Sequence, residues 1–311
     1  MRILMLGAGG IGGYFGARIH HAGGDITFLV RPARARGLLE DGLHVLSPLG
    51  DVRIAPKLIT SVQDSTAGKF DAVILSCKAY DLDSAMDTIA PALASDGIVV
   101  PLLNGIAHLA RLDERFGHAR VLGGLAHLGV TLTAEGKIRH LNELHRMVIG
   151  TRAAPAPSPV AALAKVLGST DIDFHLSGNI EGEMWDKFVF LSALAGATCT
   201  MRASIGDILQ TASGEDFILG LLDECSAVAR KHGHMPSEER LAQSRMQLTA
   251  RGSMSTASML RDIERNGQTE ADHILGDMVH RAMAHGIDTP LLKVAYTHLQ
   301  SYEARRRREQ S

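Results

Sequence analysis

The sequence predicts an α/β domain with a parallel, doubly wound sheet over residues 1–175, followed by an all-helical domain over residues 176–311. In the first half, short apolar runs alternate with segments of helical periodicity, as in a sheet whose strands are joined by helices. In the second half, apolar residues recur at spacings of three and four almost throughout. A chain of 311 residues is also longer than one hydrophobic core usually organises.

The expected strands of the first domain are short and apolar. Ile3–Leu6 leads into a cluster of glycines, a helical segment follows at Ile11–His21, and Ile26–Val30 forms a second strand. Further strands are expected at Leu43–Leu46, Val52–Ala55, Ala72–Ser76, Ile98–Leu102 and Val121–Leu125, and helices at Leu82–Leu93 and His108–Phe116. Gly129–Thr133 and Lys137–Leu141 indicate a hairpin added late in the domain.

The boundary between the domains depends on how Ala153–Pro159 is interpreted. This Ala- and Pro-rich stretch is either an interdomain linker or a surface loop that enters a helix at Val160–Leu167. A strand-like piece, Ile172–His175, comes next, which favours the loop and puts the boundary near Leu176. Beyond it, helices are expected at Asn179–Leu194, Gly214–His232, Glu238–Leu248, Thr269–His285 and Pro290–Ser301, with Asn179 and Ser237 as N-caps.

The composition favours a cytoplasmic protein without nucleic-acid or membrane partners. Lys and Arg number 32 against 34 Asp and Glu, and the Arg305–Arg308 run is typical of a solvated helix end. No apolar stretch approaches the roughly 18 residues that span a bilayer, and the N-terminus has no signal-peptide pattern. Three cysteines without CxxC spacing indicate reduced thiols. An apolar face of the helical domain can pack on a second copy, so a homodimer is a hypothesis.

The sequence Gly7-Ala8-Gly9-Gly10-Ile11-Gly12 predicts a dinucleotide-binding turn of the Rossmann type. It lies directly after an apolar strand and opens an apolar helix, which is the context that this GxGxxG pattern requires. Gly7 permits the tight turn, Gly9 lets the backbone approach a pyrophosphate, and Gly12 lets the helix pack on the strand. The amides of Gly10 and Ile11, at the helix N-terminus, face the anion. A purely structural turn is the alternative.

Arg31 indicates which dinucleotide the turn binds. It follows the second strand, where NAD- and FAD-binding chains usually carry an acidic residue for the ribose hydroxyls. No carboxylate stands at that tip, and Arg34 and Arg36 are close behind. A guanidinium suits the 2′-phosphate of NADP(H), which it can hold in bidentate fashion. The alternative is that Arg31 is an ordinary surface residue.

Two polar residues follow other strands. Lys78 comes directly after one strand, and Asn104 comes after another. In an open α/β sheet the ligand crevice lies outside the carboxyl ends of the strands, so both can reach the cofactor. Each is generic by itself, and Asn104-Gly105 can also be a simple turn.

A reductase also needs a group that donates a proton to the developing alkoxide. The 15 histidines are scattered and form no metal-ligand cluster, so no metal is expected and a lysine or histidine acid is simpler. Lys187 is one candidate, although spacing alone favours an ordinary exposed Glu183–Lys187 pair. The segment from Ser255 to Glu270 can be no more than a helix start at Ser255 and a capping box near Thr269. The residues alone leave these alternatives open.

Taken together and in this order, these segments resemble the ketopantoate reductase (2-dehydropantoate 2-reductase) family over essentially the whole chain. The residues that carry the resemblance are Gly7–Gly12, Arg31, Lys78, Leu103-Asn104-Gly105, Trp185-Asp186-Lys187, Ser258-Met259-Leu260-Arg261-Asp262 and Thr269-Glu270. The resemblance implies a Rossmann domain, a helical domain like that of 6-phosphogluconate dehydrogenase, and substrate bound between them. It implies NADPH-dependent reduction of a 2-keto acid, most directly ketopantoate to pantoate in pantothenate and coenzyme A synthesis.

The resemblance also implies a role for each matching residue. Lys187 corresponds to the catalytic proton donor, and Glu270 to a carboxylate that contacts the cofactor and orients that lysine. Ser258 corresponds to a substrate-binding serine, and Asn104 to an asparagine that touches cofactor and substrate. A lysine beside a carboxylate and a nicotinamide can be tuned by its neighbours, so these roles are chemically coherent.

The sequence departs from the family pattern on the substrate side. Where the family carries substrate-binding asparagines, this chain has Leu191, Ala195 and, at about the third position, Ile205. Loss of these amides removes hydrogen bonds that discriminate between substrates. Two alternatives therefore stand beside ketopantoate: a more apolar 2-keto acid, or a non-catalytic NADP(H)-binding redox sensor. Arg202, near in sequence, is a hypothetical replacement contact for the substrate carboxylate.

Overall fold

The computed structural model describes residues 1–62 and 68–310 and divides into two compact units. The first unit comprises Met1–Leu103 and His108–Glu181, and the second comprises Asn104–Ala107 and Gly182–Ser311. The domain boundary that we predict at 175/176 stays a prediction, and the units divide between Glu181 and Gly182.

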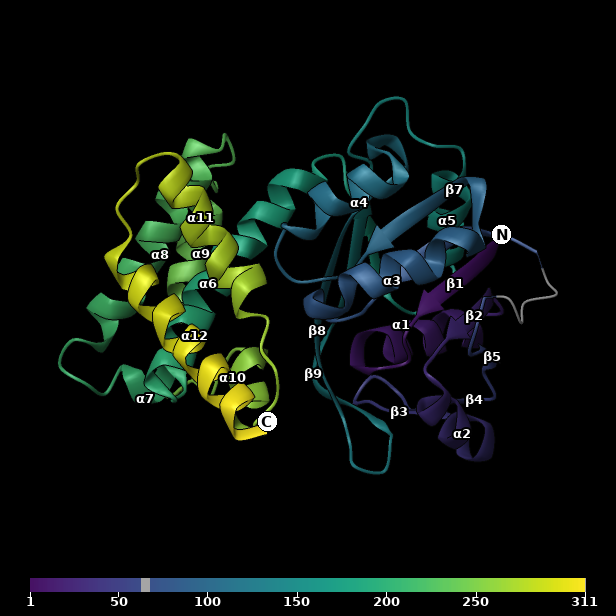
Figure 1. Cartoon of the computed structure of the whole chain (residues 1–311), viewed down its shortest axis with the longest axis horizontal. Coiled ribbons are helices and arrows are strands. Elements are labelled where there is room, and N and C mark those ends of the chain that lie inside the picture. The colour runs from purple at the N-terminus through teal and green to yellow at the C-terminus, as the bar shows by residue number, and fades with distance from the viewer. Residues whose placement is uncertain (63–67, 311) are drawn as a thin grey trace. The chain divides into compact units, whose positions relative to one another are not determined.

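A parallel five-stranded sheet organises the first unit (Figure 1). Its strands lie in the order β5-β2-β1-β6-β7, and all pairs are parallel. The strands are β1 (Arg2–Leu6), β2 (Asp25–Leu29), β5 (Lys57–Ile59), β6 (Phe70–Leu75) and β7 (Leu93–Pro101). The chain moves outward from β1 through β2 and then crosses to β6 on the other side of β1. This reversal next to β1 is the place where open α/β sheets bind ligands.

A second, mixed sheet contains the other strands of this unit. Its order is β10-β9-β3-β4, and β8 pairs with β9. The strands are β3 (Leu43–Leu46), β4 (Val52–Ile54), β8 (Gly123–Leu132), β9 (Ile138–Gly150) and β10 (Asp173–Leu176). Alternation of strands and helices predicted one parallel sheet, and that detail is wrong for these strands: β3 and β4 pair antiparallel, as do β8 and β9. The predicted hairpin is confirmed as the outer part of β8 and β9.

Short helices connect these strands. They are α1 (Gly10–His21), α2 (Pro32–Asp41), the 3₁₀ turns η1 (Ala79–Asp81), η2 (Ala90–Ala92) and η3 (His118–Arg120), α3 (Leu82–Ile89), α4 (His108–Phe116) and α5 (Pro159–Gly168). The glycine-rich helix α1 lies in the core, which it shares with residues of both sheets. Its Gly13 and Gly16 explain the close packing: a Cβ on Gly13 would lie 2.2 Å from Ile138, and one on Gly16 would lie 2.5 Å from Phe28.

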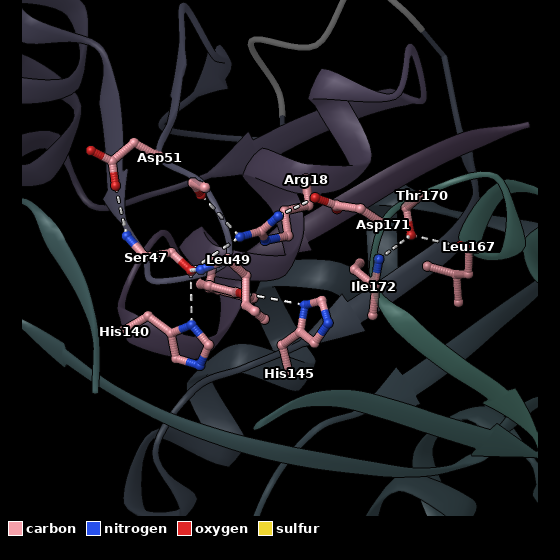
Figure 2. Close-up of polar contacts among 12 residues, drawn as sticks. Arg18, Ser47, Leu49, Asp51, His140, His145, Leu167, Thr170, Asp171 and Ile172 are labelled. Carbon is pink, nitrogen blue, oxygen red and sulfur yellow. Dashed lines mark hydrogen bonds and ion pairs between the residues drawn. The ribbon is translucent and has the colours of Figure 1, made fainter. Parts of the chain in front are cut away.

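A buried arginine fixes α1 in place (Figure 2). The Arg18 guanidinium forms an ion pair with Asp171 and donates to Ser47 Oγ and to the Gly50 carbonyl, each at 3.2 Å. Ser47 Oγ lies 2.9 Å from His140 Nδ1 on β9. The helix after the glycine turn is therefore tied to the loop after β3, to β9 and to the segment before β10.

The second unit is helical (Figure 1). Its helices are α6 (Ile180–Met201, whose first two residues count with the first unit), α7 (Ile205–Ile208), α8 (Gly214–Lys231), α9 (Glu238–Leu248), α10 (Ser258–Glu264), the π-helical turn η4 (Asp272–Gly276), α11 (Asp277–Ala284) and α12 (Pro290–Gln310). Helices α8, α11 and α12 pack on one another. Across residues 1–62 and 68–310, none of the helices combines the length and apolarity of a membrane span.

Several helix ends differ from the prediction. The Ser237 N-cap is confirmed, because its side chain accepts from the Arg240 amide. The helix start at Ser255 is wrong, since α10 begins at Ser258. Helix α12 continues to Gln310 instead of stopping at Ser301, because its arginines and glutamates pair along the helix and support further turns.

Candidate active site

The glycine turn occupies the loop from β1 to α1. Gly7 has a φ of +93°, and a Cβ on Gly12 would lie 2.2 Å from Ser76 Oγ and 2.5 Å from the Gly7 carbonyl oxygen. Both positions therefore require glycine for reasons internal to the fold. Gly9 is different, because no atom lies within 4 Å of where its Cβ would be. The open face at Gly9 suits the approach of a ligand, which is the role predicted for this residue.

The rest of the turn also fits an anion. Gly10 and Ile11 form the first turn of α1, which contains no acidic residue. Their amides stand at the positive end of the helix dipole. Gly10 is covered on its other side, where its Cβ would lie 2.9 Å from Val130 of β8.

Arg31 lies at the tip of β2 with its side chain 78% exposed. Its Nη2 atom is 3.1 Å from Asp81 Oδ2. Asp81 belongs to η1, the 3₁₀ turn that is the next element after β6. The local sequence around Arg31 contains no carboxylate at the strand tip, but the fold brings one from 50 residues away. Asp81 is therefore a site residue that sequence reasoning missed.

Arg34 is a second residue that the prediction did not select. Its guanidinium donates to the Ala8 carbonyl within the glycine turn, with Nη2 at 3.2 Å and Nε at 3.3 Å. Burial lowers the pKa of this guanidinium. A guanidinium group is thus hydrogen-bonded to the backbone of the glycine turn. The signal in the sequence was the place of Arg34 on the first turn of α2, three residues after Arg31.

Lys78 completes the first half of the candidate site. It is partly buried and is the N-cap residue of η1, in the segment that follows β6. Strands β2, β1 and β6 are neighbours in the sheet, so Arg31, the glycine turn and Lys78 all follow carboxyl ends on one edge. The structure therefore brings these sequence-predicted residues together within the first unit.

Asn104 lies in a segment that groups with the helical unit. Gly105 has a φ of +76°, so Asn104-Gly105 is also the turn that the alternative interpretation expected. A Cβ on Gly105 would lie 3.1 Å from the His273 carbonyl oxygen. The His273 amide in turn donates to the Glu270 carbonyl at 3.1 Å. The chain at Asn104 is thus packed against the turn that begins at Glu270.

Lys187 is on α6, two residues after the buried Trp185. Neither Lys187 nor Glu183 is exposed, so the alternative of an exposed surface pair is wrong. Burial lowers the pKa of the Lys187 ammonium group to about 8. A lysine of this kind holds its proton at neutral pH but gives it up more readily than a surface lysine.

Glu270 is buried, and the residue before it, Thr269, is hydrogen-bonded to a side chain of α12. The Thr269 amide and hydroxyl both donate to Glu303 Oε1, at 2.6 and 2.8 Å. The other oxygen of Glu303 pairs with Arg306 at 3.0 Å, and these two side chains are only 13% and 12% exposed. The capping box suggested near Thr269 is therefore wrong. Glu303 was missed because it lies 34 residues from Thr269 in a segment that the sequence shows only as a charged helix.

The remaining predicted residues lie in the helical unit. Ser258 is the exposed first residue of α10, and the preceding Ala257 amide donates to Thr198 of α6. Leu191 and Ala195 follow Lys187 by one and two turns of α6, where Leu191 is partly buried and Ala195 fully buried. Ile205 starts α7 and is also buried. These three positions present hydrocarbon where the family pattern has amides.

Metal-ligating side chains do not cluster in the described parts of the chain: residues 1–62 and 68–310 contain no group of three or more that could hold an ion.

Comparisons with known proteins agree with both halves of the fold. The family model described as "Ketopantoate reductase PanE/ApbA" matches residues 3–154, and the one described as "Ketopantoate reductase PanE/ApbA C terminal" matches residues 179–303. These matches identify an oxidoreductase with a Rossmann-type N-terminal part and a helical C-terminal part. The chain belongs to the ketopantoate reductase family.

Two relatives align over nearly their whole length. The protein named uncharacterized oxidoreductase YkpB of Bacillus subtilis (strain 168) is 35% identical over 98% of this chain and 99% of its own. A 2-dehydropantoate 2-reductase of Halobacterium salinarum is 26% identical over 94% of this chain and 96% of its own.

Two solved structures share the fold. A PanE/ApbA family ketopantoate reductase from Ralstonia eutropha JMP134 superposes with a TM-score of 0.89 at 23% identity, covering 99% of this chain and 100% of its own. D-mandelate dehydrogenase with NADH and anilino(oxo)acetate superposes with a TM-score of 0.88 at 20% identity, covering 99% of both chains.

Proposed function

We propose that the protein reduces a 2-keto acid with NADPH, and that its substrate is 2-dehydropantoate, which it converts to pantoate for pantothenate and coenzyme A synthesis in the cytoplasm. The observation that carries the proposal is Lys187, a partly buried lysine whose pKa is lowered to about 8, in a family of oxidoreductases. A dinucleotide sensor without turnover has no use for such a proton donor. The predicted homodimer remains a hypothesis.

The chemistry assigns one task to each half of the site. When bound, the nicotinamide supplies a hydride to the keto carbon. Lys187 holds a proton on Nζ and releases it to the keto oxygen, so that the carbonyl becomes a hydroxyl and the amine is left neutral. Because its pKa is lowered only to about 8, the Lys187 side chain is mainly protonated at pH 7. Glu270 orients the lysine, and Asn104 and Ser258 bind substrate.

The first unit supports NADP(H) as the cofactor. The amides of Gly10 and Ile11 and the open face of Gly9 suit the pyrophosphate, and Lys78 stands at the same sheet edge. Arg31 is exposed at the strand tip, and Arg34 lies on the glycine turn, so two guanidinium groups are available to a 2′-phosphate. Asp81 pairs with Arg31 and would have to yield that guanidinium to the phosphate.

Replacement of Arg31 tests the cofactor assignment. Arg31→Ala should narrow the preference for NADPH over NADH by ~1–3 kcal/mol, the scale of a hydrogen bond to a charged group. The measurement is kcat/KM for both cofactors with one fixed substrate. An unchanged ratio would show that Arg31 does not read the 2′-phosphate.

A second candidate substrate is a more apolar 2-keto acid. Leu191, Ala195 and Ile205 favour it, because aliphatic side chains cannot hydrogen-bond the hydroxyl of a hydroxylated keto acid. A hydrophobic pocket rejects an added hydroxyl only by ~10²-fold, so both substrates can turn over at different rates.

The deciding experiment measures NADPH oxidation with ketopantoate and with a panel of 2-keto acids that carry aliphatic or aromatic side chains. The highest kcat/KM for ketopantoate supports pantoate synthesis, and the highest value for an apolar acid supports the second candidate. Absence of turnover with every acid would overturn both.

A further inference from the structure

A surface pocket of about 260 Å³ lies in the helical unit. Its lining comes from residues that follow α6 and α10 and from the last turns of α12, and Figure 1 shows the ribbons of these helices. It is lined by Arg202, Asn266, Tyr302, Arg305, Arg306 and Glu309. Arg202 directly follows α6, the helix that carries Lys187. None of the residues that line the pocket belongs to the set that we assign to catalysis, cofactor or substrate. Arg202 lines this pocket with Tyr302 and the arginines of α12, so we assign it here and not to the substrate carboxylate that its place in the sequence suggested.

The backbone conformation of Arg202 is one that favours glycine, so the presence of an arginine side chain there needs a separate explanation. Its φ is +53°, in the left-handed region that favours glycine. The Ala203 amide bonds to the Thr198 carbonyl at 3.3 Å, which closes the end of α6 in the motif where glycine usually stands. The Arg202 guanidinium instead lies over the Tyr302 ring, 5.6 Å from its centroid. The turn alone does not explain an arginine here.

The charges of the pocket are unbalanced. Arg305 pairs with Glu309 at 2.7 Å, while Arg306 pairs with Glu303 outside the lining. Arg202 has no ion pair with any residue in 1–62 or 68–310. The lining itself has three arginines and one glutamate, and the Glu303 partner of Arg306 brings the net formal charge of the cluster to +1. Each guanidinium has five N–H donors, so these pairs leave donors unused.

We propose that this pocket binds a phosphate dianion, either inorganic phosphate or the phosphate group of a small monoester. An anion matches the excess positive charge of the cluster, and guanidinium groups fit phosphate oxygens in bidentate fashion. The volume is below the roughly 300–1,000 Å³ of pockets for drug-sized ligands, which suits a small anion. The site does not depend on the reductase assignment.

The test is calorimetric titration of the full chain with inorganic phosphate and, separately, with glycerol 3-phosphate. The affinity for both should fall at least tenfold in Arg202→Ala. The matched control is Arg251→Ala, which removes the same charge from a 77% exposed arginine of the same unit and should change the affinity less than twofold. Equal affinities for the two probes would show that the phosphate group alone is recognised, and tighter binding of the ester would identify a monoester as the ligand.

A second variant separates binding from folding. Arg202→Gly places the residue preferred for φ +53° at this position, so its melting temperature should equal or exceed that of the wild type while phosphate binding is lost. Absence of phosphate binding to the wild type, equal weakening by Arg202→Ala and Arg251→Ala, or retained binding in Arg202→Gly would each overturn the proposal.

Discussion

The glycine turn of the first unit and the Lys187–Glu270 region of the second are held in different ways. The turn is shaped by the absence of side chains: Gly7 supplies a positive φ, and Gly12 leaves room for Ser76 and the Gly7 carbonyl. The second region is held by side chains that come from far along the chain, since Glu303 of α12 binds Thr269 beside Glu270. The first can be damaged by adding one methyl group, and the second by removing one carboxylate.

Loss of the proton donor should give the largest effect. Lys187→Ala should lower kcat by ~10²–10⁴-fold, the usual contribution of a general acid, while NADPH affinity is retained because the glycine turn is untouched. In the wild type, kcat should fall as pH rises through about 8, because the neutral amine has no proton to give. Steady-state kinetics and fluorescence titration of NADPH check both parts. A normal rate in Lys187→Ala would remove the lysine from the mechanism.

Adding a methyl group to the turn should give the next largest effect. Gly12→Ala would place a Cβ 2.5 Å from the Gly7 carbonyl, so we expect ~1–3 kcal/mol of destabilisation and weaker NADPH binding. Gly37→Ala is the matched control, since no atom lies within 4 Å of its Cβ position on α2. It should be neutral or stabilising by up to ~1 kcal/mol. Urea denaturation measures both, and equal stability of the two variants would contradict this account of Gly12.

Weakening the anchor of Glu270 should act on catalysis and leave the cofactor site intact. Glu303→Gln keeps an acceptor for Thr269 but loses the nearly buried charge pair with Arg306, so we expect a loss of ~1–3 kcal/mol of stability and a lower kcat at unchanged NADPH affinity. The control is Glu309→Gln, which removes the exposed i,i+4 partner of Arg305 on the same helix. It should change the free energy of unfolding by less than ~0.5 kcal/mol. If the two variants behave alike, Glu303 has no special role beside Glu270.

The smallest effect is expected at Asp81. Asp81→Asn removes the charge that pairs with the exposed Arg31, and surface pairs of this kind contribute ~0–1 kcal/mol. Because Arg31 no longer has to leave a carboxylate, NADPH should bind up to ~5-fold more tightly, with little change for NADH. Comparison of the two dissociation constants checks this. Weaker NADPH binding would mean that Asp81 positions Arg31 and does not compete for it.

The difference between a locally built turn and a region held by distant side chains also explains what the sequence could predict. The turn at Gly7–Gly12 is a local pattern, so its place between β1 and α1 followed from adjacent residues. Strands β3, β4 and β8 were assigned to the wrong sheet because strand pairing is set by long-range contacts that alternation does not encode. Asp81 and Glu303 were missed for the same reason, since each reaches its partner from 34 or more residues away. Lys187 and Glu270 were selected only through family resemblance, because their spacing also fits ordinary helices.

The bond from Thr269 to Glu303 also sets an order of events during synthesis. Translation proceeds at ~5–20 residues per second, so the 122 residues from Glu181, the last residue of the first unit, to Glu303 take roughly 6–24 s to make. In that interval the nascent chain already contains every residue of the dinucleotide turn, while Thr269 has no carboxylate to hold it. A growing chain can therefore take up the nucleotide well before it can use it.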